Sequence, residues 1–305
     1  MSLAPIILFV YNRPCHTCQV VEALQKNILA KESKLIIYSD GFKSDKDKKE
    51  VESVRKYIRT ILGFVDVEII EKTKNFGLAK SIIEGVTEVI NRYGKVIVLE
   101  DDLVVSPFFL DYMNSALQIY ESEDKVASIH GYIFPVKHQL PETFFLRGAD
   151  CWGWGTWKRA WNFFEKDSNK LLKEIKKRKL TSQFDFGGGY PFLQMLKMQT
   201  RGLVDSWAIQ WYASTFLKEM LTLYPGRSLV KNIGIDGSGR HGGVVNIFFT
   251  ELSSMPIKVN RIEIKESHES LLIIKSFYKS LKVKNILILI RIKNFLKILY
   301  KQLGF

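Results

Sequence analysis

Three adjacent carboxylates, Glu100, Asp101 and Asp102, directly follow the apolar run at residues 96–99. Like charges this close repel one another, so the triplet needs an offsetting cation or a set of hydrogen-bond donors. Carboxylate oxygens suit Mg²⁺ and Mn²⁺, which often bind through one or two carboxylates together with substrate phosphates. The triplet therefore predicts a divalent cation site. The alternative is a solvated acidic turn or a helix N-cap ahead of Pro107.

The first 130 residues, which would position this triplet, alternate between strand-like and helix-like runs. Strands are expected at residues 5–11, 35–38, 65–70 and 95–99, and helices at residues 15–27, 43–62 and 77–93. Such alternation is typical of a mainly parallel, doubly wound α/β sheet, which binds ligands at the carboxyl ends of its strands. Arg13, Asp40 and the acidic triplet all follow predicted strands, so we expect them at one edge.

The middle of the chain is richer in aromatic residues and glycine. Residues 147–164 hold four of the six tryptophans, and Gly-rich stretches occupy residues 186–190 and 234–243. The first Gly-rich stretch is not a phosphate-binding P-loop, because no Gly-Lys-Ser/Thr follows it. We expect it to be a mobile loop near an acceptor. The sequence contains no internal repeat and no low-complexity linker, which favours one composite domain.

The stretch Val-Leu-Glu-Asp-Asp-Leu-Val-Val-Ser-Pro-Phe-Phe around the triplet resembles the metal and nucleotide motif of GT-A glycosyltransferases. The resemblance is greatest to the group around the inverting N-acetylglucosaminyltransferase that starts complex N-glycan branching. Bacterial sugar transferases of polysaccharide clusters are also similar, including the Trp-rich segment. The resemblance covers about residues 4–250. The other matching segments, in the same order, are residues 5–13, 35–41, 205–207 and 234–242.

The resemblance implies a GT-A fold, a Rossmann-like and mainly parallel sheet with helices on both faces. It also implies a donor site. Asp102 would coordinate the Mn²⁺ or Mg²⁺ cofactor that bridges the donor diphosphate. Asp101 would contact the ribose, Glu100 the donor sugar and Asp40 the base of the nucleotide. Arg13 would neutralise phosphate charge, a task suited to a guanidinium.

The resemblance further implies a general base and a loop over the donor. Asp205 would take the proton of the acceptor hydroxyl, a poor nucleophile until a carboxylate deprotonates it. The family has a second acid where this chain has Ser206, so the role passes to Asp205 only. Ser238, Arg240 and His241 would belong to a glycine-hinged lid that reaches the diphosphate. A solvent-exposed hairpin loop is the alternative.

Three further residues are candidates for contact with the sugar or the acceptor. Trp154 and Trp207 would offer their ring faces to a sugar, although tryptophans often simply pack in a core. Asp150 would accept a hydrogen bond from a sugar hydroxyl, or it is a turn residue.

The three cysteines fit a reducing compartment. Cys15 and Cys18 form a Cys-x-x-Cys pair where a strand meets a helix, as in redox proteins. No second Cys/His pair has a spacing suited to zinc. We interpret the pair as ordinary cysteines in the first turn of a helix.

The positive charge is concentrated near the C-terminus. The chain has 305 residues, with 45 Lys and Arg against 32 Asp and Glu, a net charge of +13. Its 46% hydrophobic and 25% charged residues are typical of a globular protein and exclude a disordered chain or a collagen.

Residues 270–305 have the pattern of a basic amphipathic helix, typical of a helix at an anionic membrane surface. The alternative is a helix that packs on the body or on a second subunit. Because the charge is not interleaved with aromatics on one face, we expect no nucleic-acid partner.

No signal peptide or spanning helix is expected. The N-terminal apolar run has no basic residue ahead of it, and Arg13 interrupts it. The longest apolar stretch near the C-terminus stops at Arg291, far short of the about 20 residues that span a bilayer. We therefore expect a cytoplasmic protein, peripheral on the inner face of the cell membrane.

Together these features predict a metal-dependent glycosyltransferase that moves a hexosyl or N-acetylhexosaminyl group, with inversion. The donor would be a nucleotide-sugar, with a UDP-sugar favoured, and the acceptor a saccharide or lipid-linked saccharide in polysaccharide or glycan assembly. Residues 1–130 would form the nucleotide-sugar half, residues 131–255 the acceptor half and residues 256–305 the basic tail. A nucleotidyltransferase and a non-catalytic sugar- or nucleotide-binding protein are the alternatives.

Overall fold

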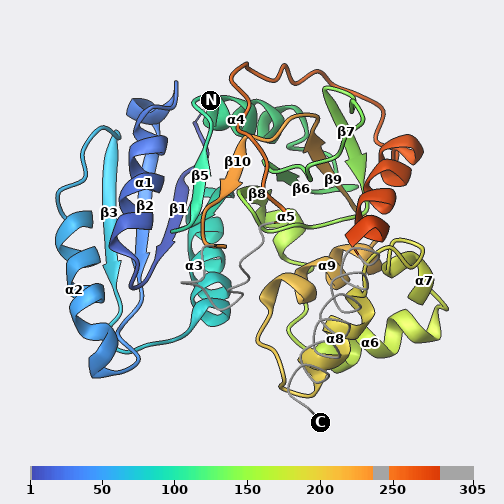
Figure 1. Ribbon diagram of the computed structural model, residues 1–305, viewed down its shortest axis with the longest axis horizontal. Coiled ribbons are helices and arrows are strands. Elements are labelled where there is room, and N and C mark those ends of the chain that lie inside the picture. The colour runs from blue at the N-terminus through green and yellow to red at the C-terminus, as the bar shows by residue number, and fades with distance from the viewer. Residues whose placement is uncertain (1, 236–246, 282–305) are drawn as a thin grey trace, which may run out of the picture.

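The computed structural model describes residues 2–235 and 247–281, and within them one eight-stranded sheet forms the centre of the molecule (Figure 1). The strand order is β3-β2-β1-β4-β8-β6-β9-β7. The strands are β1 (Ile6–Val10), β2 (Lys34–Ser39), β3 (Asp66–Glu71), β4 (Lys95–Glu100), β6 (Val126–His130), β7 (Thr143–Leu146), β8 (Trp154–Trp157) and β9 (Leu221–Pro225). This arrangement confirms the predicted α/β class with its mostly parallel sheet.

The pairing directions place six strand ends at one edge of the sheet. Strands β3, β2, β1 and β4 are mutually parallel. Strand β8 runs antiparallel to both β4 and β6, so β4 and β6 point the same way, and β9 is parallel to β6. The carboxyl ends of β1, β2, β3, β4, β6 and β9 therefore share an edge, where parallel sheets bind their ligands.

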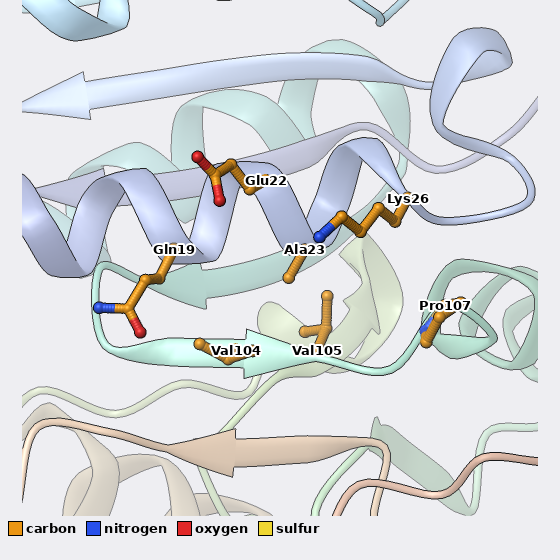
Figure 2. Close-up of a pocket in the computed structure, with 7 residues that line it drawn as sticks. All are labelled: Gln19, Glu22, Ala23, Lys26, Val104, Val105 and Pro107. Atoms are coloured by element: carbon orange, nitrogen blue, oxygen red, sulfur yellow. The ribbon is translucent and has the colours of Figure 1, made fainter.

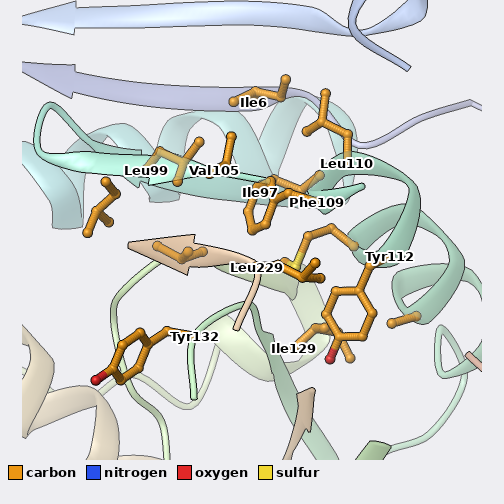
Figure 3. Close-up of a cluster of buried hydrophobic side chains, with 14 of the residues drawn as sticks. Ile6, Ile97, Leu99, Val105, Phe109, Leu110, Tyr112, Ile129, Tyr132 and Leu229 are labelled. Carbon is orange, nitrogen blue, oxygen red and sulfur yellow. The ribbon is translucent and has the colours of Figure 1, made fainter. Parts of the chain in front are cut away.

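Helices cover both faces of the sheet, as the alternation of buried side chains along the strands requires. Ile6 and Leu8 of β1 face one core, whereas Ile7 and Phe9 face the other. The first core packs against α1, α2 and α4, and Figure 3 shows strand and α4 side chains meeting there. The second core packs against α3 and α9. The helices are α1 (Pro14–Gln25), α2 (Asp45–Ile58), α3 (Leu78–Tyr93), α4 (Phe109–Ile119), α5 (Lys158–Trp161), α6 (Ser168–Lys177), α7 (Thr181–Phe184), α8 (Phe192–Thr200) and α9 (Trp207–Leu217), with a 3-10 turn η1 (Ala30–Glu32).

The elements predicted for the first half of the chain are confirmed. Each of the four predicted strands ends within one residue of its observed bounds, and the three predicted helices are α1, α2 and α3. The predicted boundary near residue 130 coincides with the end of β6, inside the sheet, so both halves contribute strands to one structure.

A small second sheet connects two distant parts of the chain. Strand β5 (Leu103–Val105), which follows the acidic triplet, pairs antiparallel with β10 (Val230–Asn232). The sequence gives no sign of this pairing, because both strands are only three residues long.

The beginning of the basic tail belongs to the body of the protein. Residues 268–281 are helical, and Ile274, Tyr278 and Leu281 are buried. The Tyr278 ring packs on Tyr190 at 4.9 Å and on Phe192 of α8 at 6.3 Å between ring centres. For residues 268–281, the structure therefore agrees with the alternative interpretation of the tail, a helix that packs on the body of the protein. Residues 282–305 lie outside the described residues. Of the helices in the described ranges, none has the length and apolar character needed to cross a membrane.

Candidate functional site

The acidic triplet meets Arg13 at the shared carboxyl edge. Arg13 follows β1 and is the N-cap residue of α1, and its guanidinium Nη2 lies 2.5 Å from Asp101 Oδ1 and 3.0 Å from Asp102 Oδ2. The backbone N–H of Tyr11 donates to the other oxygen of Asp101 at 3.3 Å. One cation therefore joins two of the three carboxylates, which is the offsetting group that the triplet requires.

The charges at this edge are not fully balanced. Burial raises the pKa of Asp101 to about 6, although Arg13 acts in the opposite direction. Burial, with the nearby charges of Asp102 and Asp101, raises the pKa of Glu100 to about 8. Burial acts to lower the pKa of Arg13, but its two carboxylate partners outweigh this effect and raise it. The site thus holds surplus negative charge, which a bound cation would offset.

The donor set is compatible with the predicted metal at Asp102. Among the described residues, only the Arg13 side chain donates a hydrogen bond to the Asp102 carboxylate, and it contacts one of the two carboxylate oxygens. Across the same ranges, no group of three or more His, Cys, Asp or Glu side chains is arranged to hold a metal ion. Asp102 therefore suits a hard cation that takes one carboxylate from the protein and further oxygens from substrate phosphates.

Strand β10 brings the second half of the chain onto this ion pair. The Ile233 N–H donates to the backbone carbonyl of Asp102 at 2.9 Å. Gly234 follows, and a Cβ there would collide with the Asp102 carboxylate and approach Arg13 Nη1 to 2.9 Å. Only glycine lets the backbone lie this close. The sequence showed a Gly-rich stretch here but not the contact with the triplet.

The chain on both sides of the predicted lid is anchored near the site. On the N-terminal side of residues 236–246, Gly234 packs on Asp102. On their C-terminal side, the Phe248 carbonyl accepts a hydrogen bond from the Tyr132 hydroxyl at 2.8 Å. The Phe248 ring also meets Trp152 edge-on at 5.9 Å. The three predicted lid residues, Ser238, Arg240 and His241, lie outside the described residues.

Asp40 follows β2 and organises the loop between β3 and α3. Its carboxylate accepts hydrogen bonds from the backbone N–H groups of Gly41, Phe76 and Gly77, each at 2.9 Å. The Asn75 side-chain amide donates to it as well, at 3.0 Å. Both oxygens are therefore used inside the protein. The contact of Asp40 with a nucleotide base stays a prediction.

The loop that Asp40 holds carries a basic cluster around an aromatic ring. The ammonium groups of Lys72, Lys74 and Lys80 lie 5.6, 5.5 and 4.4 Å from the centre of the Phe76 ring. These cation–π contacts hold three positive charges close to the strand ends. Their electrostatic potential would attract an anionic ligand to this edge of the sheet. The charge of this loop was visible in the sequence, but its position beside Asp40 was not.

The tryptophan predictions need correction. Trp154 has no exposed surface, and Trp207 is only 3% exposed. Their rings stack on each other at 5.3 Å and pack with Trp211 and Trp161 in the core between β8 and α9. Ring faces covered by other rings cannot receive a sugar, so the packing alternative is correct for these two residues. The partly exposed member of the segment is Trp152.

Asp150 lies in the segment that leads into β8. Its Oδ2 accepts a hydrogen bond of 2.6 Å from the hydroxyl of Tyr224 on β9, and burial raises its pKa to about 6. The next residue, Cys151, has a thiol whose pKa is raised by burial and by the charges of Glu100, Asp150 and Asp102. The Cys151 thiol is therefore within electrostatic reach of both Asp150 and the acidic triplet.

Asp205 and Ser206 lie at the start of α9. Ser206 is the N-cap residue, and its hydroxyl accepts from the Ile209 N–H at 3.4 Å. Asp205 is exposed. Because Trp207 stacks on Trp154, which pairs with Val98 of β4, the start of α9 is attached to the central sheet. The base role of Asp205 stays a prediction.

Two further features are a surface groove and the three cysteines. A groove between α1 and β5, lined by Gln19, Lys26 and Val104 among others, holds none of the predicted site residues (Figure 2). The three cysteines are free thiols, of which Cys15 is exposed.

Comparisons with known proteins give little beyond this geometry. No protein-family model matches the sequence, and no curated protein matches it. Among solved structures, S. aureus TarS is similar over 57% of this chain and 29% of its own, at 14% identity and a TM-score of 0.35. S. aureus TarS 1-349 in complex with UDP-GlcNAc is similar over 56% of this chain and 47% of its own, at 13% identity and a TM-score of 0.33. Likeness this low assigns no activity to the chain.

Proposed function

We propose that this protein is a glycosyltransferase that moves a sugar from a nucleotide-sugar to a saccharide acceptor. The observation that carries the proposal is the Arg13–Asp101–Asp102 constellation at the carboxyl ends of β1 and β4, with the backbone of Gly234 against it. Glycosyl transfer must stabilise a departing nucleoside diphosphate, which requires positive charge at a site of this kind. The family resemblance favours a UDP-sugar.

Each residue has a distinct role in this proposal. Asp102 would hold Mn²⁺ or Mg²⁺, which when bound stabilises the charge of the leaving diphosphate. Arg13 binds the two aspartates and would place a permanent positive charge beside the donor phosphates. Asp101 would receive the ribose and Glu100 the donor sugar. Asp40 shapes the loop with Lys72 and Phe76, against which the base would lie.

One metal and one base suit a single displacement with inversion at the anomeric carbon. The acceptor hydroxyl loses its proton as its oxygen attacks, and the diphosphate leaves with the electron pair of the broken bond. The resemblance assigns the base to Asp205. Hexosyl and N-acetylhexosaminyl groups both remain within the proposal.

The proposed acceptor is a saccharide or a lipid-linked saccharide at the inner face of the cell membrane. Residues 282–305 carry six Lys and Arg residues and no Asp or Glu. Each basic side chain near an anionic bilayer contributes about 1 kcal/mol of attraction. This segment would hold the protein at the surface where lipid-linked acceptors lie.

The test is a thermal-shift and turnover panel of UDP-, GDP-, CMP- and dTDP-sugars, each with Mn²⁺ and with EDTA. A ligand that binds the folded state raises the melting temperature. We expect one nucleotide class to give a metal-dependent shift and nucleotide release. Asp102→Asn should abolish both, whereas Asp111→Asn on α4 serves as the matched control. Metal-dependent binding without any turnover would instead favour a non-catalytic binding protein, and no response to any donor would refute the proposal.

A further inference from the structure

Asp150 is held in one orientation at the carboxyl edge of the sheet. Its Oδ2 accepts the Tyr224 hydroxyl at 2.6 Å, and Tyr224 lies one residue before the end of β9. Gly148 lets that hydroxyl approach the backbone, because a Cβ there would collide with it. Among the described residues, Tyr224 is the only hydrogen-bonding partner of the Asp150 side chain, so one carboxylate oxygen stays available.

Aromatic side chains lie near this carboxylate, since its charge acts on Tyr132, Tyr190 and Tyr278. Tyr132 and Trp152 meet edge-on at 4.8 Å, and Tyr190 and Tyr278 pack at 4.9 Å. Trp152 and Tyr190 are partly exposed. Partly exposed rings beside a carboxylate are typical of pockets that bind a small polar ring, with apolar packing below and hydrogen bonds at its rim. The titratable groups that face Asp150 are Cys151, Tyr132, Tyr190, Tyr212, Tyr224 and Tyr278.

The segment that carries Asp150 lies beside the proposed donor site, because Trp154 pairs with Val98 of β4 and Gly153 lies against Leu99 and Val230. Strands β4 and β9 are separated by β8 and β6, so they are three strand spacings apart, about 14 Å. The charges of Glu100, Asp150 and Asp102 all act on the neighbouring Cys151 thiol and raise its pKa. A donor whose diphosphate is held at the end of β4 would therefore extend its sugar toward Asp150.

We propose that Asp150 is the general base that deprotonates the acceptor, in a saccharide subsite formed with Trp152 and Tyr190. This inference rests on the proposed glycosyltransferase function. The proton of the acceptor hydroxyl moves to the free carboxylate oxygen of Asp150. The acceptor oxygen bonds to the anomeric carbon of the donor, the bond from that carbon to the diphosphate oxygen breaks, and the diphosphate keeps the electron pair.

Asp150 meets the requirements of a base better than Asp205 does. A carboxylate is a stronger base where its environment disfavours the charged form, as burial does at Asp150. Asp205 is exposed, and no hydrogen bond to its side chain is found among the described residues. The Tyr224 hydroxyl orients Asp150, whereas within the same ranges no described group orients Asp205.

The test measures nucleotide release from UDP-N-acetylglucosamine, or from the panel donor that the wild type cleaves, with water and with azide as acceptors. Azide is an anion and brings no proton to remove. Asp150→Asn and Asp150→Ala should lose about 100-fold or more in transfer to water, with the KM for the donor nearly unchanged. Azide should restore release in Asp150→Ala but not accelerate the wild type. Asp111→Asn is the control, and the melting temperature of each variant reports folding.

A second variant tests the base without removing it. Tyr224→Phe deletes the hydrogen bond that favours the charged form of Asp150, so the acid limb of the pH–rate profile should move to higher pH. An unmoved limb, or Asp150 variants within threefold of wild type, would overturn the proposal. A larger, azide-rescued loss in Asp205→Asn would also overturn it. If the wild type cleaves no donor, the proposed function fails and this inference fails with it.

Discussion

Replacing Asp40 by Asn tests whether this residue holds the protein together before any nucleotide binds. The carboxylate accepts backbone hydrogen bonds from Gly41, Phe76 and Gly77 and one from the Asn75 side chain, and it lies at the N-terminus of α3. An amide keeps one acceptor oxygen and turns its NH₂ group toward donors. At least one N–H then loses its partner, and the negative charge is lost.

The magnitude follows from these contacts. A hydrogen bond to a charged group contributes about 1.5–3 kcal/mol. A negative charge at a helix N-terminus adds about 0.5–1 kcal/mol. We therefore expect Asp40→Asn to lower the free energy of unfolding by about 3 kcal/mol. For a chain of this size, that corresponds to a melting temperature lower by roughly 6 °C.

The assay is thermal unfolding followed by circular dichroism, without nucleotide or metal. Asp66→Asn is the matched control, since the Asp66 side chain is 57% exposed and forms a surface ion pair with Lys34, and such pairs contribute about 0–1 kcal/mol. A melting temperature for Asp40→Asn no lower than that of the control would refute the reasoning. It would leave Asp40 with a role in nucleotide binding alone.

Three further changes have defined outcomes. Gly234→Ala forces a methyl group against Asp102 and should lower donor-dependent turnover about tenfold or more, while overpacking costs about 1–3 kcal/mol of stability; full turnover in steady-state assays would contradict this. Removal of residues 282–305 keeps the packed Tyr278, so the truncated chain should melt like the full chain but no longer sediment with anionic vesicles; retained sedimentation would count against the membrane role. Burial lowers the pKa of His130 to about 3, so only the unfolded state takes up this proton between pH 6.5 and 5, and stability falls as the pH falls. His130→Gln should reduce that loss by about 1.5 kcal/mol in urea titrations, and an equal loss in both proteins would disprove it.

The first four strands and three helices were predictable because their signals are local. Strands β1, β2 and β4 are short apolar runs buried on both faces, whereas β3 is half-buried at the sheet edge, and each strand is followed by polar residues that end it. The β–α order then fixes a parallel sheet and brings the strand ends together. For this reason Arg13 could be placed at the same edge as Asp101 and Asp102 before their contacts were known, although it lies 88 and 89 residues from them in the chain.

The remainder of the site depends on contacts between distant residues that carry no local pattern. The bond between Tyr224 and Asp150 joins residues 74 positions apart. A tryptophan has the same local signature in a core as on a sugar platform, so the burial of Trp154 and Trp207 followed only from the position of α9. In the same way, Gly234 reads as an ordinary loop glycine until β10 is paired with β5.

The pairing of β5 with β10 also limits how this protein can be re-engineered. The strand after the triplet and the strand before Gly234 share backbone hydrogen bonds, so the two segments form one mechanical unit despite their separation in the gene. A chimera that exchanges residues 100–105 alone would bring a foreign strand against the native β10. The proposed donor site is therefore built from two separate segments of the chain, and a successful transplant must carry residues 230–234 together with the acidic motif.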